Sequence, residues 1–186
     1  MQPFIGQGNQ LAAQNDREGA IQRYQAALEL DPQLDLNPED QFQNIQQQTA
    51  AQNLISEIQS LAQSGDLTQA LAKFQTLENT YPKAVDAETL NVLCWDGALN
   101  NQASQVLPLC DRAVTLAPED TDIEDSRGLA RALTGDFAGA ITDFQAFVDS
   151  SDQIEESKAK RRAWIEALKA GKNPFTPEVL EALKGP

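Results

Sequence analysis

The sequence predicts an all-α protein built from repeated helix pairs. Four stretches share one spacing: a small or aliphatic residue, an apolar residue four positions later, and an apolar or small residue three positions after that. Turn residues separate these stretches, and no run of alternating β-branched residues indicates a strand. Such self-similarity indicates stacked units, because one helix pair cannot bury its apolar face alone. The copies are Ala20-Tyr24-Ala27, Ala70-Phe74-Leu77, Val106-Cys110-Ala113 and Ala140-Phe144-Phe147, and the first three are followed by Pro32, Pro82 and Pro118.

A second regularity lies twelve residues upstream of two copies. Gly8 precedes Ala20 and Gly128 precedes Ala140 by that distance, and a small residue there would let two helices pack closely. Turn residues lie between the paired helices, at Asn15-Asp16, Gly65-Asp66 and Gly135-Asp136, because Gly ends a helix readily and Asp caps the next one. Three residues depart from the pattern: Ile58 and Cys94 replace the small residue, and Pro108 falls inside a helix.

These motifs resemble the tetratricopeptide repeat (TPR), a helix-turn-helix unit. The resemblance implies a TPR-like right-handed helical solenoid of about four helix pairs with a C-terminal capping helix. We expect a single domain over residues 1–186. Its units are expected at about 1–34, 51–84, 87–118 and 121–152, with capping helices over 153–186. An irregular helical bundle with coincidental spacing is the alternative.

The first elements follow from caps and prolines. Helices are expected over residues 3–14 and 17–30, and the second ends at Asp31-Pro32. Asn37 and Pro38 then form an N-cap and a first helical position, and acids follow in the first turn. No Gly or Pro interrupts the chain up to Ser64, so a helix of up to about 27 residues is expected. Its glutamine-rich first half has Phe42, Ile45 and Thr49 on one face, and a disordered stretch is the competing interpretation.

The later elements have similar signals. Asp86 caps a helix that runs to Leu99, and Asn100-Asn101 forms a turn before the next helix, which ends at Pro118. Acids in residues 119–125 suit a helix start, and the glycine-centred ligand order of a calcium loop is missing. A capping helix is expected over 153–170, and Thr176 caps a short final one. Trp164, Ile165, Leu168 and Phe175 are expected to cover the last repeat.

Charge is distributed unevenly along the chain. The net charge is −14 without histidine, which disfavours nucleic acid as a partner. Residues through Glu156 hold 25 acids and 7 bases, whereas residues from Ser157 hold 3 acids and 7 bases. The basic residues Lys158, Lys160, Arg161 and Arg162 are interpreted as a solvated face that complements the acidic body. A docking site for an acidic partner or surface is the sharper alternative.

The two cysteines lie in one unit, and the TPR resemblance implies that their slots face each other. Cys94 occupies the small-residue slot, and Cys110 occupies the slot that Tyr24, Phe74 and Phe144 fill elsewhere. We expect two buried free thiols in a reducing cytosol, with a disulfide or redox switch as the alternative. A zinc site is disfavoured, because the chain has no histidine and no second cysteine pair.

Catalytic chemistry finds little support. No glycine-rich phosphate loop is present, and the carboxylates fall mostly at helix starts and exposed faces. We expect no enzyme activity, no cofactor and no metal. The sequence also lacks a run of about 18 apolar residues, so no membrane span is expected.

The resemblance implies that peptides bind in the concave groove formed by the first helices. One TPR subclass clamps the acidic tails of heat-shock chaperones with cations, but Ile5 and Glu88 stand where lysines would be needed. A basic or polar peptide is therefore the expected partner. The groove residues expected from the resemblance are Ile5, Asn9, Gln52, Gln59, Glu88, Asn91, Trp95, Asp122, Asp125 and Leu129.

The passages LELDPQLDLNPED and NPFTPEVLEALK extend the resemblance to C-terminal TPR modules of cyanobacterial multidomain signalling proteins. This resemblance and the abrupt start are compatible with a piece of a longer polypeptide. The expected function is a non-catalytic protein–protein interaction module or scaffold. A structural spacer or self-association module is the alternative, motivated by the amphipathic helix from Pro38. A cytoplasmic location and a monomer or weak dimer are expected.

Overall fold

The chain forms helices throughout the residues that the structure describes. The computed structural model describes residues 2–184, which hold ten α-helices, one 3₁₀ turn and no strand. The predicted all-α repeat fold is therefore confirmed. The chain divides into two compact units, residues up to Leu54 and residues from Ile55 onwards, and each is described by itself. The boundary falls inside α3 (Pro38–Gln63), so the division into domains stays a prediction.

The first unit contains α1 (Gln2–Ala13), α2 (Arg17–Leu30) and the first half of α3. Asn15 makes the turn with φ of 64°, and the Asp16 carboxylate caps α2 by accepting the Gly19 N–H at 3.0 Å. Buried Ala12, Ala20, Tyr24 and Phe42 form the core.

The glutamine-rich stretch is helical, and its polar side chains take part in the packing. Gln41 Nε2 donates to Asn9 Oδ1 at 3.0 Å, and Gln46 Nε2 donates to the Ala12 carbonyl. Phe42 is buried, and Ile45 packs against the same core. These contacts explain why this segment folds as a helix: its one apolar face has a partner within the chain.

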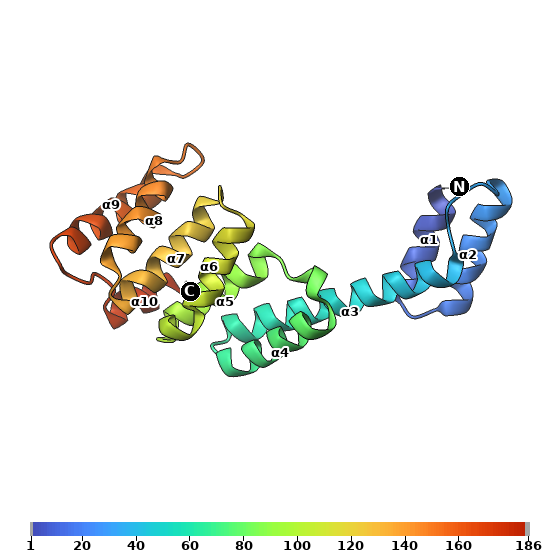
Figure 1. The fold of residues 1–186 in the computed structure, drawn as a ribbon, viewed down its shortest axis with the longest axis horizontal. Coiled ribbons are helices and arrows are strands. Elements are labelled where there is room, and N and C mark those ends of the chain that lie inside the picture. The colour runs from blue at the N-terminus through green and yellow to red at the C-terminus, as the bar shows by residue number, and fades with distance from the viewer. Residues whose placement is uncertain (1, 185–186) are drawn as a thin grey trace. The chain divides into compact units, whose positions relative to one another are not determined.

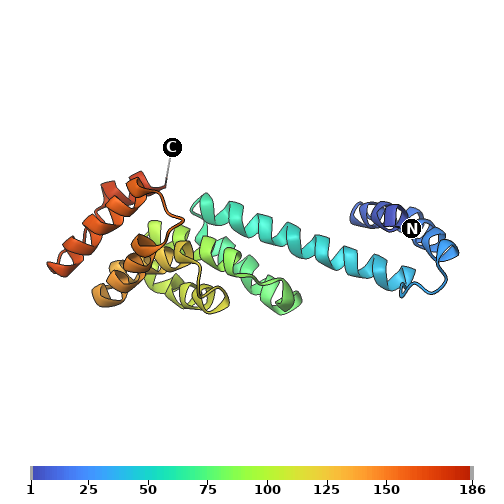
Figure 2. The same ribbon diagram turned by 90° about the horizontal axis from the view of Figure 1, so that it is seen from above.

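The second unit begins with the end of α3, which runs beside α4 (Leu67–Thr80; Figure 2). The remaining elements are η1 (Pro82–Ala84), α5 (Ala87–Leu99), α6 (Ala103–Leu116), α7 (Thr121–Thr134), α8 (Phe137–Asp149), α9 (Glu155–Lys169) and α10 (Pro177–Leu183). Helices α5 and α6 form one packed pair and α7 and α8 another, and α9 packs on α8 (Figure 1). Helices α5 and α7 also lie against each other, as first helices of successive units.

Pro108 does not break α6, which runs from Ala103 to Leu116. Proline lacks the N–H that would bond the carbonyl four residues earlier, so one helical hydrogen bond is lost. The residue is exposed, so the freed Ser104 carbonyl is left on a side of the helix near solvent. The departure from the repeat pattern therefore leaves the third pair intact.

One contact recurs within the helix pairs, between residues sixteen positions apart. A Cβ on Gly8 would lie 2.7 Å from Tyr24 Cδ1, and a Cβ on Gly128 would lie 2.8 Å from Phe144 Cε1. Ile58 and Phe74, which occupy the same two slots in the second pair, are 0% and 3% exposed. Glycine on one helix thus makes room for an aromatic ring on the other.

In the third pair, a disulfide fills the same two slots. Cys94 on α5 and Cys110 on α6 are bonded, with Cα atoms 5.1 Å apart, and no described cysteine is free. The expectation of two free thiols was therefore wrong. The helices approach within the range of about 4.4–6.8 Å that a disulfide requires, because neither slot holds a ring to separate them.

The glycine contact predicts opposite effects for two neighbouring substitutions in α1. Gly8→Ala should destabilise the fold by about 1–3 kcal/mol, because buried Tyr24, held by its hydrogen bond to Asn9, cannot yield to the new methyl group. Gly6→Ala should stabilise it by up to about 1 kcal/mol, because alanine favours the helix and no atom lies within 4 Å of the added carbon. Urea unfolding measures both, and effects of the same sign would contradict the packing described.

Candidate functional site

The ten expected groove residues fall in both units. Three of them, Ile5, Asn9 and Gln52, belong to the first unit, and the other seven belong to the second. Asn9 has a structural role, because its Oδ1 accepts hydrogen bonds from Tyr24 Oη at 2.9 Å and from Gln41 Nε2 at 3.0 Å. Ile5 is half-buried and Gln52 is exposed.

Helix α5 has three of the expected residues and is covered over most of its length. None of its residues from Thr89 to Leu99 is exposed. Glu88, in the first turn, is exposed. Asn91 and Trp95 are half-buried, as is Gln59 near the end of α3. The Asn91 Oδ1 atom is buried and lacks a hydrogen-bond partner among the described residues. Burial also raises the pKa of the neighbouring Asp96 carboxyl above its ordinary value.

Helix α7 has fewer accessible groove residues than the sequence predicted. Leu129 is 0% exposed, so it belongs to the core and cannot contact a ligand. Asp125 is also buried, and its carboxylate accepts from Arg161 of α9, with Nε 2.9 Å from Oδ1. Asp122 is exposed and accepts from Gln153 Nε2 at 2.8 Å. Only Asp122 of these three remains accessible.

Arg161 joins the capping helix to the repeats. Its guanidinium lies 4.5 Å from the ring centroid of Phe147 and 4.7 Å from that of Trp164. Burial raises the pKa of the Asp125 carboxyl, and the hydrogen bonds and charge of Arg161 oppose that rise. The ion pair therefore lies between aromatic rings and holds α9 against α7.

A second buried carboxylate, Asp143, was not anticipated from the sequence. Arg127 Nη2 and Arg131 Nη1 lie 2.7 Å and 2.9 Å from its oxygens, so two guanidiniums surround one charge. Arg131 also reaches Asp111 of α6 at 3.4 Å. Burial and the nearby Asp143 charge raise the pKa of Glu124. The signal in the sequence is weak: two arginines four residues apart and an aspartate next to an aromatic slot. The network joins α6, α7 and α8.

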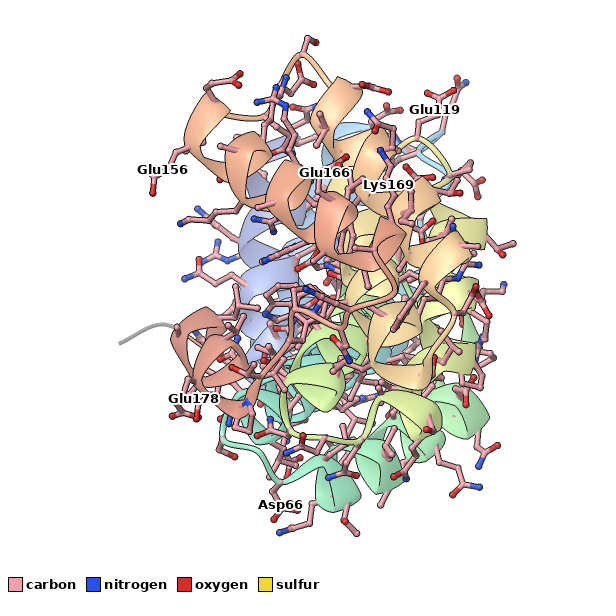
Figure 3. The ribbon with its side chains drawn as sticks, turned by 90° about the vertical axis from the view of Figure 1, so that its left-hand side faces the viewer. Asp66, Glu119, Glu156, Glu166, Lys169 and Glu178 are labelled. Carbon is pink, nitrogen blue, oxygen red and sulfur yellow. A yellow bond between two sulfur atoms is a disulfide. The ribbon has the colours of Figure 1, made fainter. Side chains whose placement is uncertain are left out.

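The basic residues of α9 are engaged largely within the helix itself. Lys160 pairs with Glu156 at 3.2 Å, Lys169 pairs with Glu166 at 2.9 Å, and Arg162 contacts Glu155. Figure 3 shows Glu166 and Lys169 next to each other on this helix. Among the ion pairs of α9 in the described residues, only that of half-buried Arg161 with Asp125 reaches another helix. The choice between a complementary face and a docking site for acidic partners stays a prediction.

An open hollow of about 540 Å³ lies between the α6–α7 and α8–α9 connections. Its lining includes Glu119, Asp120, Asp122 and Asp152, and the Asp120 carboxylate is already used to cap α7. No group of three or more residues suited to hold a metal ion occurs among residues 2–184.

The C-terminal segment caps the stack and then turns back. The rings of Phe144, Trp164 and Phe175 form one cluster, with centroids 4.9 Å apart for Trp164 and Phe175. Ile165 and Leu168 are buried as well, so the expected cover of the last repeat is confirmed. Helix α10 itself, however, packs against α5, one helix pair earlier.

Comparisons with known proteins identify the fold. No family model and no curated protein matches the chain. Among solved structures, the crystal structure of the P58(IPK) TPR domain superimposes with a TM-score of 0.62 and 16% sequence identity. The match covers 94% of this chain and 48% of that one, so the chain spans about half the length of that structure. At this identity the likeness shows a TPR-like fold. Within the described residues, no helix has both the length and the hydropathy needed to cross a bilayer.

The Asp125–Arg161 pair predicts non-additive stability losses. Asp125→Ala should cost about 3–5 kcal/mol, because it leaves a guanidinium buried without its partner. Arg161→Ala should leave the Asp125 carboxylate buried without its partner. The double variant should lose less stability than the sum of the two single losses, by about 0.5–3 kcal/mol. Urea unfolding of the four chains gives the coupling. Glu166→Ala, which removes an exposed pair on the same helix, is the control and should cost no more than about 1 kcal/mol. Additive losses for the buried pair would contradict its proposed role.

Proposed function

We propose that this TPR-like chain is a non-catalytic protein–protein interaction module. The carrying observation is that α5 and α7, the first helices of two successive pairs, lie side by side in a TPR-like stack. Helices arranged this way share one face, and stacked repeats use such faces for binding. The ligand is a peptide or a neighbouring domain.

The strongest candidate contacts are on α5. Trp95 is half-buried in a chain that is only 6% aromatic, and aromatic residues often carry the binding energy of protein interfaces. Asn91, one turn before Trp95, is half-buried, but its Oδ1 atom is buried and is not assigned a ligand contact. Exposed Glu88 and Asp122 give the surface negative charge, so we propose a basic or polar segment as the ligand. Asp125 and Leu129 are left out of this proposal, because both are buried.

The cellular setting is part of the same proposal. The resemblance to cyanobacterial multidomain signalling proteins supports a scaffold role within a larger protein. The cytoplasmic location expected from the sequence has one observation against it, the Cys94–Cys110 disulfide, because cytosolic thiols are normally kept reduced.

The structure does not provide the free apolar face on α3 that self-association through the helix from Pro38 would use. That idea required a free apolar face on the glutamine-rich half of α3. Phe42 is 5% exposed and lies in the core of the first unit, and Ile45 packs beside it. The apolar face is therefore occupied within the chain.

Replacing Trp95 tests the binding surface. Trp95→Ala should reduce the amount of partner captured from a lysate of the native organism at least about ten-fold, since an interface hot spot contributes about 2 kcal/mol or more. Quantitative mass spectrometry after pull-down measures the loss, and circular dichroism checks that the helices persist. Leu116→Ala is the matched control, because it removes an apolar side chain that is 56% exposed at the end of α6. Unchanged capture by a folded Trp95→Ala chain would remove α5 from the binding surface.

A further inference from the structure

The path of the chain after α9 brings its last helix to α5. Gly171, with φ of +71°, ends α9, and its N–H donates to the Leu168 carbonyl at 2.9 Å. The Lys172 N–H donates to the Ala167 carbonyl at 2.9 Å, so the reversal has defined geometry. Helix α10 then starts at Pro177, capped by Thr176, and packs against α5. The helix to which the proposed function assigns the partner is thus in contact with the chain's own C-terminal segment.

Helix α10 depends on this contact for its structure. It has seven residues, and a helix of that length does not persist alone in water. Leu180 is its one buried residue, at 5% exposure, whereas Glu178, Glu181 and Ala182 are exposed. Val179 and Leu183 are half-buried beside Leu180. A short helix with one fully buried side chain is weakly held, and such elements open most readily.

The anchor of the segment is separate from α10. Phe175 is 6% exposed and packs against Trp164 and Phe144, with centroid distances of 4.9 Å and 6.0 Å. Its backbone N–H donates to Asn173 Oδ1 at 3.0 Å, which fixes the approach to the cluster. These contacts lie before Thr176. The aromatic cap can therefore stay in place while α10 leaves α5.

The surface of α5 is incompletely satisfied with α10 in place. Asn91 Oδ1 and Thr89 Oγ1 are buried and lack hydrogen-bond partners in the described part of the chain. A helix such as α10 uses its interior N–H groups for its own backbone bonds, so it offers few donors sideways. Both atoms stay unpaired among the described residues while α10 is in place.

From these observations we infer that α10 is an intramolecular competitor for α5. In the free chain α10 occupies part of the α5 surface, and a basic or polar partner segment must displace it in order to bind there. The inference rests on the proposed function only in placing the partner on α5. It adds that the chain's own residues 176–184 cover the site in the free chain. This segment can be displaced while Phe175 stays packed in the aromatic cluster.

The test uses chains of residues 1–186 and a synthetic peptide of residues 176–184, acetylated and amidated at its ends. Leu180→Asp removes the seated side chain, and Ala182→Asp places the same charge at an exposed position of the same helix. Peptide titrations are followed by NMR of the labelled chains, through the amide signals of α5. We expect the Leu180→Asp chain to bind the peptide at least about ten-fold more tightly than the Ala182→Asp chain or the unaltered chain. A short tether gives the chain's own segment an effective concentration in the millimolar range, which keeps the free peptide out.

Three results of these titrations would overturn the inference. The first is equal peptide affinity for the two variants, and the second is no binding to a folded Leu180→Asp chain. The third is global unfolding of both Leu180→Asp and the milder Leu180→Ala, which would make α10 part of the core. Because these titrations involve no partner, they can fail while the Trp95→Ala result stands. A partner captured equally by Leu180→Asp and Ala182→Asp would leave the proposed function intact and show that α10 does not gate it.

Discussion

The structure depends on one contact that recurs in its helix pairs, between facing positions sixteen residues apart. Two helices joined by a short turn can bury their shared apolar face only if the side chains at their closest approach fit together. Glycine beneath an aromatic ring meets this constraint at Gly8 and Tyr24 and again at Gly128 and Phe144. Ile58 and Phe74 meet it with two buried side chains, and Cys94 and Cys110 meet it with a covalent bond.

The stack ends by burying charge. Each repeat presents an apolar face to the next one, so the last repeat needs a cover. The chain supplies it with an aromatic cluster around Trp164 and with Arg161. Asp125 balances the charge of Arg161, and the guanidinium lies over the rings of Phe147 and Trp164. This arrangement withdraws Asp125 from the surface. The cap of the last repeat therefore also determines which acidic side chains remain accessible to a partner.

The fold could be predicted from the sequence because it depends on local spacing. The positions of Ala20, Tyr24 and Ala27 recur along the chain, and caps such as Asp16, Asp66 and Asp86 begin helices where expected. The binding surface could be predicted only in part, because exposure depends on contacts between distant segments. Nothing local shows that Leu129 is fully buried or that α10 returns to α5. The cysteine pairing was open for the same reason, since the family pattern places the slots opposite each other but does not decide between two thiols and a bond.

The most direct test replaces the disulfide of the third helix pair with the glycine and aromatic residue that another helix pair has at the same two positions. A Cys94→Gly, Cys110→Phe chain rebuilds in the third pair the combination found at Gly128 and Phe144. We expect this chain to fold, with a thermal midpoint that does not change with reductant and that exceeds the midpoint of the single Cys110→Phe chain. The unaltered chain should lose about 3 kcal/mol on reduction, as expected for a bridge that closes a loop of this size. A double variant no more stable than the single one would contradict the equivalence of the four contacts.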